Sequence, residues 1–249
     1  MQTDPKIPPT GQSSEELSSL EAQRVAERYD KRKRDIPVDR YSSFNLANLT
    51  QAQLRDFEIV RILRASGMVS LRDKDILEIG CGAGYYLRQF VQWGADPARI
   101  VGIDLLDERI HAARALCAPG MRLLCCDASH LPMPNGSFDL VMQYTAFSSI
   151  LDQRVRELVA AEMLRVLRPG GLILSYDMCV NNPNNPDIRK VTRAELKALF
   201  PGVRYQSRRM NLVPPVARRI GGFSPMLIAT LSKVAPFCSH LMFTSTRPS

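Results

Sequence analysis

The feature that most constrains this chain is a short strand that runs directly into three closely spaced glycines. Residues 76–79 (Ile-Leu-Glu-Ile) lead into Gly80-x-Gly82-x-Gly84, and a helical pattern begins at residue 85. Glycines let a backbone approach a ligand closely, and a helix N-terminus offers free N–H donors. Asp104 ends a second predicted strand, where a carboxylate can accept both hydroxyls of a ribose. The stretch therefore predicts a nucleoside site in an α/β protein.

The segments around this stretch alternate between strand and helix patterns. The apolar runs predict strands at 76–79, 100–103, 122–126, 138–142 and 172–176. Helical spacing predicts helices at 85–93 and 108–116 and a third that Asp152 caps. Alternation of this kind implies a parallel sheet covered on both faces. Beyond residue 176 we expect a short helix capped by Thr192, then strands at 203–212 and 240–246.

The two ends of the chain differ from this alternation. Residues 1–12 predict a disordered tail, and residues 13–67 an N-terminal helical lid ahead of a core at 68–249. Two capping boxes, Ser13-x-x-Glu16 and Thr50-x-x-Gln53, predict where the helices of the lid begin. An insert at 213–239 is too long for a hairpin, so we interpret it as a cap over an active site.

Composition limits the classes of protein that remain. The chain has 249 residues, 45% hydrophobic and 23% charged, which excludes a fully disordered or repeat-array protein. None of the six cysteines forms a C-x-x-C pair, and the first residues have no apolar signal-peptide core. We therefore expect a cytoplasmic protein with free thiols and no metal site. The apolar run near 223–238 is too interrupted to span a membrane.

The net charge of +8 is unevenly distributed. Residues 193–219 contain seven basic residues and one acid, Glu195. This stretch could bind an anionic acceptor, or stay a solvated surface. Together with the apolar run at 226–231 it could also contact a membrane surface. It lacks the regular interleaving of aromatic residues that is expected of a platform for single-stranded nucleic acid.

Two nucleotide ligands compete for the glycine loop. A dinucleotide fingerprint needs G-x-G-x-x-G, whereas here the third glycine comes one residue early and Tyr85 takes its place. Glu78, just before the loop, would repel a pyrophosphate but suits the ammonium group of an amino acid. The glycines, this acid and Asp104 together are typical of a site for S-adenosylmethionine.

Over residues 75–177 the chain resembles the class I S-adenosylmethionine-dependent methyltransferases. It is similar to the broad bacterial small-molecule group that includes the quinone C-methyltransferases. Five motifs occur in the family's order: Glu78-x-Gly80-x-Gly82-x-Gly84, Gly102-Ile-Asp104, Cys126-Asp127-Ala128, residues 137–141 followed by Gln143, and the loop at 167–171.

The resemblance implies a fold and a cofactor site. The expected fold is a Rossmann-like, seven-stranded, mostly parallel sheet with an antiparallel last strand, helices on both faces and an N-terminal helical lid. Asp104 would bind the ribose, Leu105 would pack on the adenine, and Asp127 would accept from the adenine amino group. The full expected set is Glu78, Gly80, Cys81, Gly82, Gly84, Asp104, Leu105, Asp127, Ala128 and Gln143.

The acceptor site is expected beyond the carboxyl ends of the fourth and fifth strands, because ligands of parallel sheets bind there. Candidate catalytic residues are Tyr144, which could orient a hydroxyl, and Asp177 and His240, which could act as bases. Each has a structural alternative: packing for Tyr144, loop capping for Asp177. Expected pocket residues are Tyr29, Phe147, Ser148, Tyr176 and Asn181.

The sequence thus predicts methyl transfer from S-adenosylmethionine to a small molecule, such as a secondary metabolite, sugar or lipid precursor, with oxygen as the favoured acceptor atom. Carbon or nitrogen methylation, an RNA methyltransferase and a non-catalytic binding protein remain alternatives. Residues 143–146 (Gln-Tyr-Thr-Ala) lack the motifs of amino-group and cytosine C5 nucleic-acid methyltransferases, so no DNA substrate is expected.

Overall fold

The computed structural model describes residues 13–35, 42–182, 185–201, 204–221 and 224–247. The tail predicted at 1–12 lies outside these residues. Among them, seven strands form one sheet in the order β3-β2-β1-β4-β5-β7-β6. The strands are β1 (Ile76–Ile79), β2 (Ile100–Asp104), β3 (Arg122–Cys125), β4 (Phe138–Tyr144), β5 (Leu167–Met178), β6 (Arg204–Leu212) and β7 (Cys238–Thr246).

The pairing of these strands confirms the expected fold class. Strands β1 to β5 pair in parallel, and β7 lies antiparallel between β5 and β6. The regular pairing of β5 begins at Leu172, as predicted, but the strand itself starts five residues earlier with an irregularity opposite β4. All of the parallel strands therefore present their carboxyl ends at one edge of the sheet.

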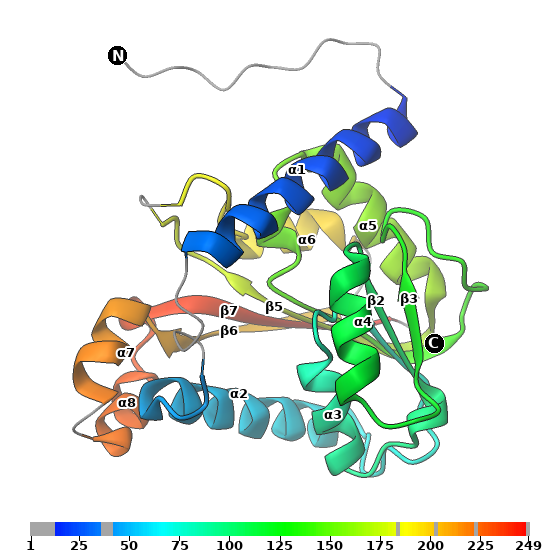
Figure 1. The fold of residues 1–249 in the computed structure, drawn as a ribbon. Helices are drawn as coiled ribbons and strands as arrows, with labels where there is room; N and C mark the ends of the chain where they lie inside the picture. The colour runs from blue at the N-terminus through cyan, green and yellow to red at the C-terminus, as the bar shows by residue number, and fades with distance from the viewer. Residues whose placement is uncertain (1–12, 36–41, 183–184, 202–203, 222–223, 248–249) are drawn as a thin grey trace, which may run out of the picture.

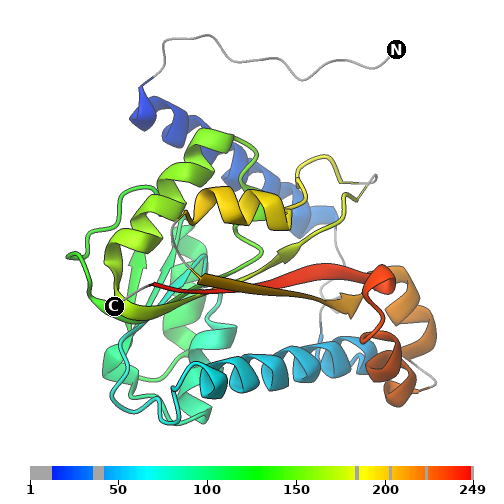
Figure 2. The same ribbon diagram turned by 180° about the vertical axis from the view of Figure 1, so that it is seen from behind.

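Helices cover both faces of the sheet (Figure 1). One face carries α5 (Gln153–Val166), α6 (Arg193–Leu199) and α1 (Ser14–Asp35), and the other carries α2 (Leu46–Ala65), α3 (Tyr85–Gln92) and α4 (Asp107–Leu116). Figure 2 shows the same layers from behind, with α2 running beneath β6 and β7. Successive residues of β5 belong to opposite cores: Ile173 packs with α5, and Leu174 packs with α2.

The two N-terminal helices begin for different reasons. At α1 the predicted capping box is present, because Ser13 and Glu16 exchange side-chain and backbone hydrogen bonds at 3.0 and 3.2 Å. The prediction that Thr50 opens the second helix is wrong. Asn45 is the N-cap of α2, since its side chain accepts from the Ala47 N–H at 3.0 Å, and Thr50 lies inside the helix. Asparagine is favoured over threonine at the N-cap of a helix.

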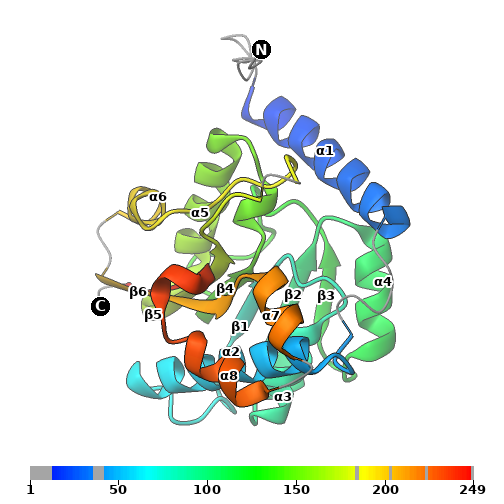
Figure 3. The same ribbon diagram turned by 90° about the vertical axis from the view of Figure 1, so that its left-hand side faces the viewer.

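The insert at 213–239 folds as α7 (Pro214–Gly221), α8 (Pro225–Leu231) and the 3₁₀ turn η4 (Ala235–Phe237). Its buried side chains, Ala217 and Ile228, form a small core with Ala47 of α2 and Leu212 of β6. Figure 3 shows α7 and α8 against α2, well away from α1. Within the described ranges, no helix combines the length and apolar character needed to cross a bilayer.

Candidate functional site

The glycine loop turns at the carboxyl end of β1. Gly80, Gly82 and Gly84 have φ angles of 68°, 55° and 76°, in the left-handed region that side chains disfavour. A Cβ on Gly84 would lie 2.3 Å from the Cys117 sulfur, so no side chain fits there. Gly84 is also the N-cap of α3. The loop thus brings bare backbone and a helix N-terminus to the edge of the sheet.

Asp104, at the end of β2, fixes this loop. Its carboxylate accepts from the Gly82 N–H at 2.9 Å and from the Leu106 N–H at 3.0 Å. The side chain is buried and lines a pocket at this edge of the sheet. Each carboxylate oxygen has a second lone pair, so Asp104 can accept further bonds from a ligand's hydroxyls.

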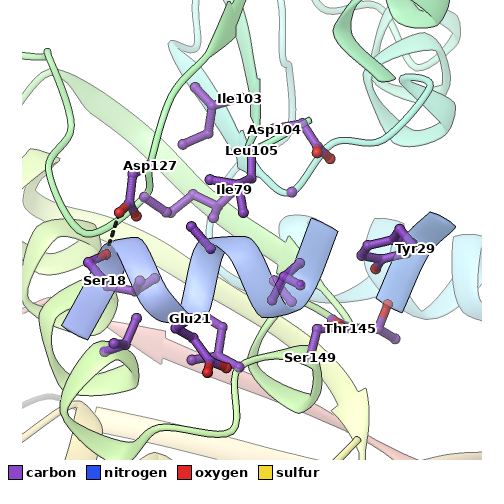
Figure 4. Close-up of a pocket in the computed structure, with 18 of the residues that line it drawn as sticks. Ser18, Glu21, Tyr29, Ile79, Ile103, Asp104, Leu105, Asp127, Thr145 and Ser149 are labelled. Carbon is purple, nitrogen blue, oxygen red and sulfur yellow. Dashed lines mark hydrogen bonds between the residues drawn. The ribbon is translucent and has the colours of Figure 1, made fainter. Parts of the chain in front are cut away.

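Asp127 follows β3 and binds the N-terminal helix. One carboxylate oxygen accepts from the Ser129 N–H at 2.8 Å, and the other accepts from the Ser18 hydroxyl of α1. Figure 4 shows α1 crossing the pocket with Ser18 turned toward Asp127. The Ser18 hydroxyl of the lid therefore already bonds one oxygen of Asp127, the residue that is expected to accept from the adenine amino group.

Helix α1 forms one wall of the pocket. Glu21 accepts from the Leu151 N–H, and Arg24 donates to the Ser149 carbonyl, so both tie the helix to the segment after β4. Arg109 of α4 lies 3.9 Å above the ring of Tyr29 and holds the other end. The pocket-lining residues of α1 are Ser18, Glu21, Ala22, Val25 and Tyr29.

The segment after β4 forms the opposite wall. Thr145 has a φ of 59°, which is rare for a residue other than glycine and indicates strain. Its N–H bonds the Tyr176 carbonyl at 2.7 Å, and the Gln143 side chain accepts from the Ala146 N–H at 2.8 Å. These bonds hold Thr145 against the pocket next to Tyr144.

Glu78 is buried on β1 beside the loop, and its Oε2 atom has no hydrogen-bond partner among the described residues. Burial, reinforced by the charge of Asp104, raises the pKa of Glu78 well above its ordinary value. A buried carboxylate oxygen without a partner is costly, and a cationic ligand would satisfy it. The chemistry of this oxygen suits an ammonium group such as that of S-adenosylmethionine.

The pocket brings together part of the predicted cofactor set. Gly80, Asp104, Leu105, Asp127 and Ala128 line it, as does the predicted substrate residue Tyr29. The remaining cofactor candidates support the loop or strands from behind the lining: Glu78, Cys81, Gly82, Gly84 and Gln143. Four predicted substrate residues also lie outside the lining, namely Phe147, Ser148, Tyr176 and Asn181.

The three candidate catalytic residues lie in different surroundings. Tyr144 lines the pocket, stacks on Tyr86 at 3.7 Å between ring centroids, and has a buried hydroxyl without a partner among the described residues. Asp177 accepts from the Ser148 and Met178 N–H groups at 3.1 and 2.9 Å, as a loop-fixing residue would. His240 stacks on Tyr176 on the α2 face of the sheet.

Their ionisation follows from these surroundings. Burial raises the pKa of Asp177 to about 6. Burial, with a contribution from the nearby Arg55 cation, lowers the pKa of His240 to about 3. The His240 ring is therefore neutral at neutral pH and a weak base. The single candidate of the three that lines the pocket is Tyr144.

The pocket contacts from α1 were missed by sequence reasoning, apart from Tyr29. Ser18, Glu21 and Val25 lie in a strongly charged helix. The hydrogen-bond partners of Ser18 and Glu21 are 109 and 130 residues away in the chain. One sequence signal for these contacts was available. Ala22, Val25 and Tyr29 are spaced three and four residues apart, which places them on one side of a helix.

The fold and site define a nucleoside-binding protein of the Rossmann-like class. Three features meet at the carboxyl edge of a parallel sheet: glycines with left-handed backbone, the acid that ends β2, and a buried acid before the loop. One oxygen of that buried acid has no partner among the described residues. These residues fit S-adenosylmethionine: Asp104 suits its ribose, Asp127 its adenine and Glu78 its ammonium group.

Comparison with known proteins agrees with this site. Residues 76–171 match a family described as a methyltransferase domain. The matched residues carry the glycine loop and the strand-end acids of the site, so this part of the chain is a methyltransferase domain similar to the S-adenosylmethionine-dependent enzymes.

Curated relatives include a chicken (Gallus gallus) tRNA N(3)-cytidine methyltransferase, METTL2, which is 34% identical over 41% of this chain and 30% of its own length. A phthiotriol/phenolphthiotriol dimycocerosates methyltransferase of Mycobacterium ulcerans is also 34% identical, over 48% of this chain and 43% of its own. The chain thus spans less than half the length of these two relatives.

Among solved structures, phosphoethanolamine N-methyltransferase 1 of Haemonchus contortus, in complex with phosphoethanolamine and S-adenosylhomocysteine, shares the fold. Its TM-score is 0.62 at 15% identity, over 93% of this chain and 50% of that protein.

Proposed function

We propose that this chain transfers the methyl group of S-adenosylmethionine to a small-molecule acceptor, with an oxygen atom as the favoured nucleophile. The observation that carries the proposal is one shared pocket. Its lining combines the cofactor residues Gly80, Asp104 and Asp127 with Tyr144 and Thr145 from the end of β4. Cofactor and acceptor walls in one cavity are what an in-line displacement requires.

The chain's own residues supply mainly positioning. When bound, S-adenosylmethionine supplies an activated methyl group whose departure leaves a neutral sulfide. Asp104, Glu78 and Asp127 would hold its ribose, ammonium and adenine groups, while α1 covers the site and excludes water. Holding the nucleophile about 3 Å from the reacting carbon provides much of the acceleration in such reactions.

The Tyr144 hydroxyl supports an acceptor-orienting role. It is buried and has no partner among the described residues, and Tyr144 is one of the residues that line the pocket. Burial raises the pKa of Tyr144 well above its ordinary value, so the hydroxyl stays protonated and donates a hydrogen bond. An acceptor oxygen would be its natural partner. Asp177 and His240 remain alternative bases, although neither lines the pocket.

The insert supports a contact with a membrane surface. Residues 213–239 contain three basic residues, Arg218, Arg219 and Lys233, and no acid. Met226 of α8 is 80% exposed and Phe237 is 50% exposed. Exposed apolar side chains beside basic ones suit an anionic lipid surface. We infer a peripheral contact with a membrane surface, and co-sedimentation with anionic vesicles should fall when Met226→Asp is introduced.

Calorimetric titration of the full chain with S-adenosylmethionine and S-adenosylhomocysteine tests the main proposal, with NAD as the control. We expect micromolar binding of the two adenosyl ligands and none of NAD. Absence of adenosyl binding would overturn the proposal. Formation of S-adenosylhomocysteine is then measured with small-molecule extracts and with total RNA as the source of acceptor. Turnover with only the first indicates a small-molecule enzyme, and turnover with only the second indicates an RNA methyltransferase.

A further inference from the structure

Three arginines recur at four-residue spacing along α1: Arg24, Arg28 and Arg32. Residues four apart lie above one another on a helix, so these side chains form a stripe next to the pocket-lining side of α1. The basic stretch singled out in the sequence, at 193–219, does not converge in this way. There, for example, Arg208 is paired with Glu58 and Arg193 lies over the ring of Tyr205.

Arg28 is 8% exposed, yet most of its guanidinium is unpaired. Its Nε and Nη1 atoms are both buried and have no hydrogen-bond partner in the part of the chain that the structure describes. Arg156 shows the contrast: it is fully buried, but it donates to Glu195 and to the Ile150 carbonyl. Buried cations are usually paired in this second manner.

Arg24, one turn earlier, has the same shortage of acceptors. Its Nε and Nη2 atoms bond the two carboxylate oxygens of Glu21, while Nη1 is buried without a partner in the described residues. Glu21 has little left to offer, because it also accepts from the Leu151 N–H. Three guanidinium nitrogens on adjacent turns, from Arg24 and Arg28, therefore lack acceptors.

The electrostatics of this cluster are unfavourable as it stands. Burial is the main factor lowering the pKa of Arg28, and the neighbouring Arg32 and Arg24 cations lower it further. Tyr29 and Asp187, which lies on the loop after β5, act in the opposite direction. An unpaired buried charge beside like charges destabilises a fold unless an anion joins it.

The cluster borders the proposed methyl-transfer pocket. Arg24 donates to the carbonyl of Ser149, and the Arg28 guanidinium carbon lies 5.1 Å from the ring centre of Tyr29. Ser149 and Tyr29 both line the pocket, and Figure 4 shows Tyr29 on α1 and Ser149 close to the same helix. An anion held by Arg24 and Arg28 would thus be attached to a molecule reaching into the pocket.

We propose that Arg24 and Arg28 bind a phosphate group carried by the acceptor. The proposal rests on the methyltransferase function above and adds the substrate class. Guanidinium groups match phosphate geometry through paired N–H donors. Because Arg24 is already paired with Glu21, Arg28 supplies the uncompensated charge, and Nη1 of Arg24 adds a further donor for an anion with several terminal oxygens. The phosphate belongs either to a soluble ester or to a lipid headgroup, since both offer the same terminal oxygens.

The test uses the full chain with inorganic phosphate as the probe, at constant ionic strength set with chloride. Thermal unfolding should shift upward with phosphate, because a ligand that binds only the folded state stabilises it. In Arg28→Met, phosphate affinity should fall roughly tenfold to a hundredfold, the usual worth of a charge-assisted hydrogen bond. Arg34→Met, an exposed arginine on the same helix, should bind phosphate as the unaltered chain does.

A second readout separates binding from a structural role. Without phosphate, Arg28→Met should unfold at a higher temperature than the unaltered chain, because an unpaired buried charge has been removed. A residue that merely supports the fold would give the opposite shift. No phosphate effect on the unaltered chain, equal affinity for acetate, or equal phosphate binding by Arg28→Met would each overturn the proposal.

Two further arms identify the source of the phosphate. Glycerol 3-phosphate represents a soluble ester, and phosphatidylcholine vesicles with and without phosphatidic acid represent a lipid headgroup. Binding of either that depends on Arg28 supports the proposal. Calorimetry with S-adenosylhomocysteine on the same variants keeps the two proposals distinct. Retained cofactor binding with no phosphate binding would overturn the phosphate site alone.

Discussion

The Ser18 hydroxyl of α1 donates a hydrogen bond to the Asp127 carboxylate, 109 residues further along the chain. This bond joins the lid helix to the residue expected to recognise adenine. Ser18 also lies 2.8 Å from the Ser129 hydroxyl, so the contact is part of a small polar network over the pocket. Lid position and cofactor recognition therefore share one carboxylate.

Replacing Ser18 with alanine should loosen the lid without removing the adenine acceptor. We expect backbone amides of α1 to exchange with deuterium roughly fivefold to tenfold faster, the effect of losing about one hydrogen bond. S-adenosylhomocysteine affinity should change by less than that, since Asp127 keeps both oxygens. The exposed neighbour provides the control: Ser19→Ala should alter neither quantity. Unchanged exchange in Ser18→Ala would show that α1 is held by other contacts.

Glu78 should discriminate between ligands with and without an ammonium group. Glu78→Gln preserves shape but removes the charge beside the loop. We expect calorimetry to show S-adenosylhomocysteine binding roughly tenfold to a hundredfold more weakly, because a charge-assisted hydrogen bond is lost. Binding of 5′-methylthioadenosine, which lacks the amino-acid group, should be unchanged. A parallel loss for both ligands would mean that Glu78 acts through packing of β1.

Asp104 should matter for the cofactor more than for the fold. Asp104→Ala leaves the Gly82 and Leu106 N–H groups without their acceptor, which costs about 1–3 kcal/mol of stability. The far-ultraviolet circular dichroism should still show a folded chain, while S-adenosylhomocysteine binding weakens. Asp107→Ala, an exposed acid at the start of α4, is the matched control. Unaltered affinity in Asp104→Ala would refute the ribose role.

The parts of the site that sequence predicted are those fixed locally. The glycine loop, the helix caps at Asp152 and Thr192 and the capping box at Ser13 depend on residues within a few positions of each other. The apolar runs between the helical segments likewise predicted the sheet, since central strands such as β1 and β4 are buried on both faces. Within such short windows, residue type nearly determines backbone conformation.

The remaining features depend on contacts that the sequence order hides. The Ser18–Asp127 bond and the burial of Arg28 arise only once α1 has packed across the sheet edge. The cap predicted from the insert illustrates the same limit. Its amphipathic helices needed an apolar partner, and the partner is α2 rather than the pocket. The positive φ of Thr145 is imposed by its bond to Tyr176 on the neighbouring strand.

His240 should make the fold more sensitive to mild acid. Its pKa is lowered to about 3 when folded, whereas an unfolded histidine has a pKa of about 6.5. As the pH falls from 7 to 5, the unfolded chain takes up a proton that the folded chain does not, so unfolding is favoured. The free energy of unfolding of His240→Gln, taken relative to that of the unaltered chain, should therefore be about 2 kcal/mol higher at pH 5 than at pH 7. Urea denaturation at the two values measures this difference. A constant difference would mean that the ring is solvated.

Asp177 should have the opposite pH dependence in an overlapping range. Burial raises its pKa to about 6 when folded, against about 3.9 unfolded, so the folded chain holds the extra proton between these values. The proton held by Asp177 therefore stabilises the folded chain fully below pH 4. About 3 kcal/mol of this stabilisation is lost as the pH rises past 6.

In the unaltered chain the Ser148 and Met178 N–H groups each bond a different oxygen of the Asp177 side chain. Asp177→Asn removes the titration and leaves a single side-chain oxygen for these two donors. The variant should therefore be less stable than the unaltered chain at pH 4.5, and the gap should narrow steadily toward pH 7. Urea denaturation in half-unit steps measures the slope. A gap that widens with pH would show that the carboxylate is stabilised as the anion by its two N–H donors, and that burial is the smaller effect.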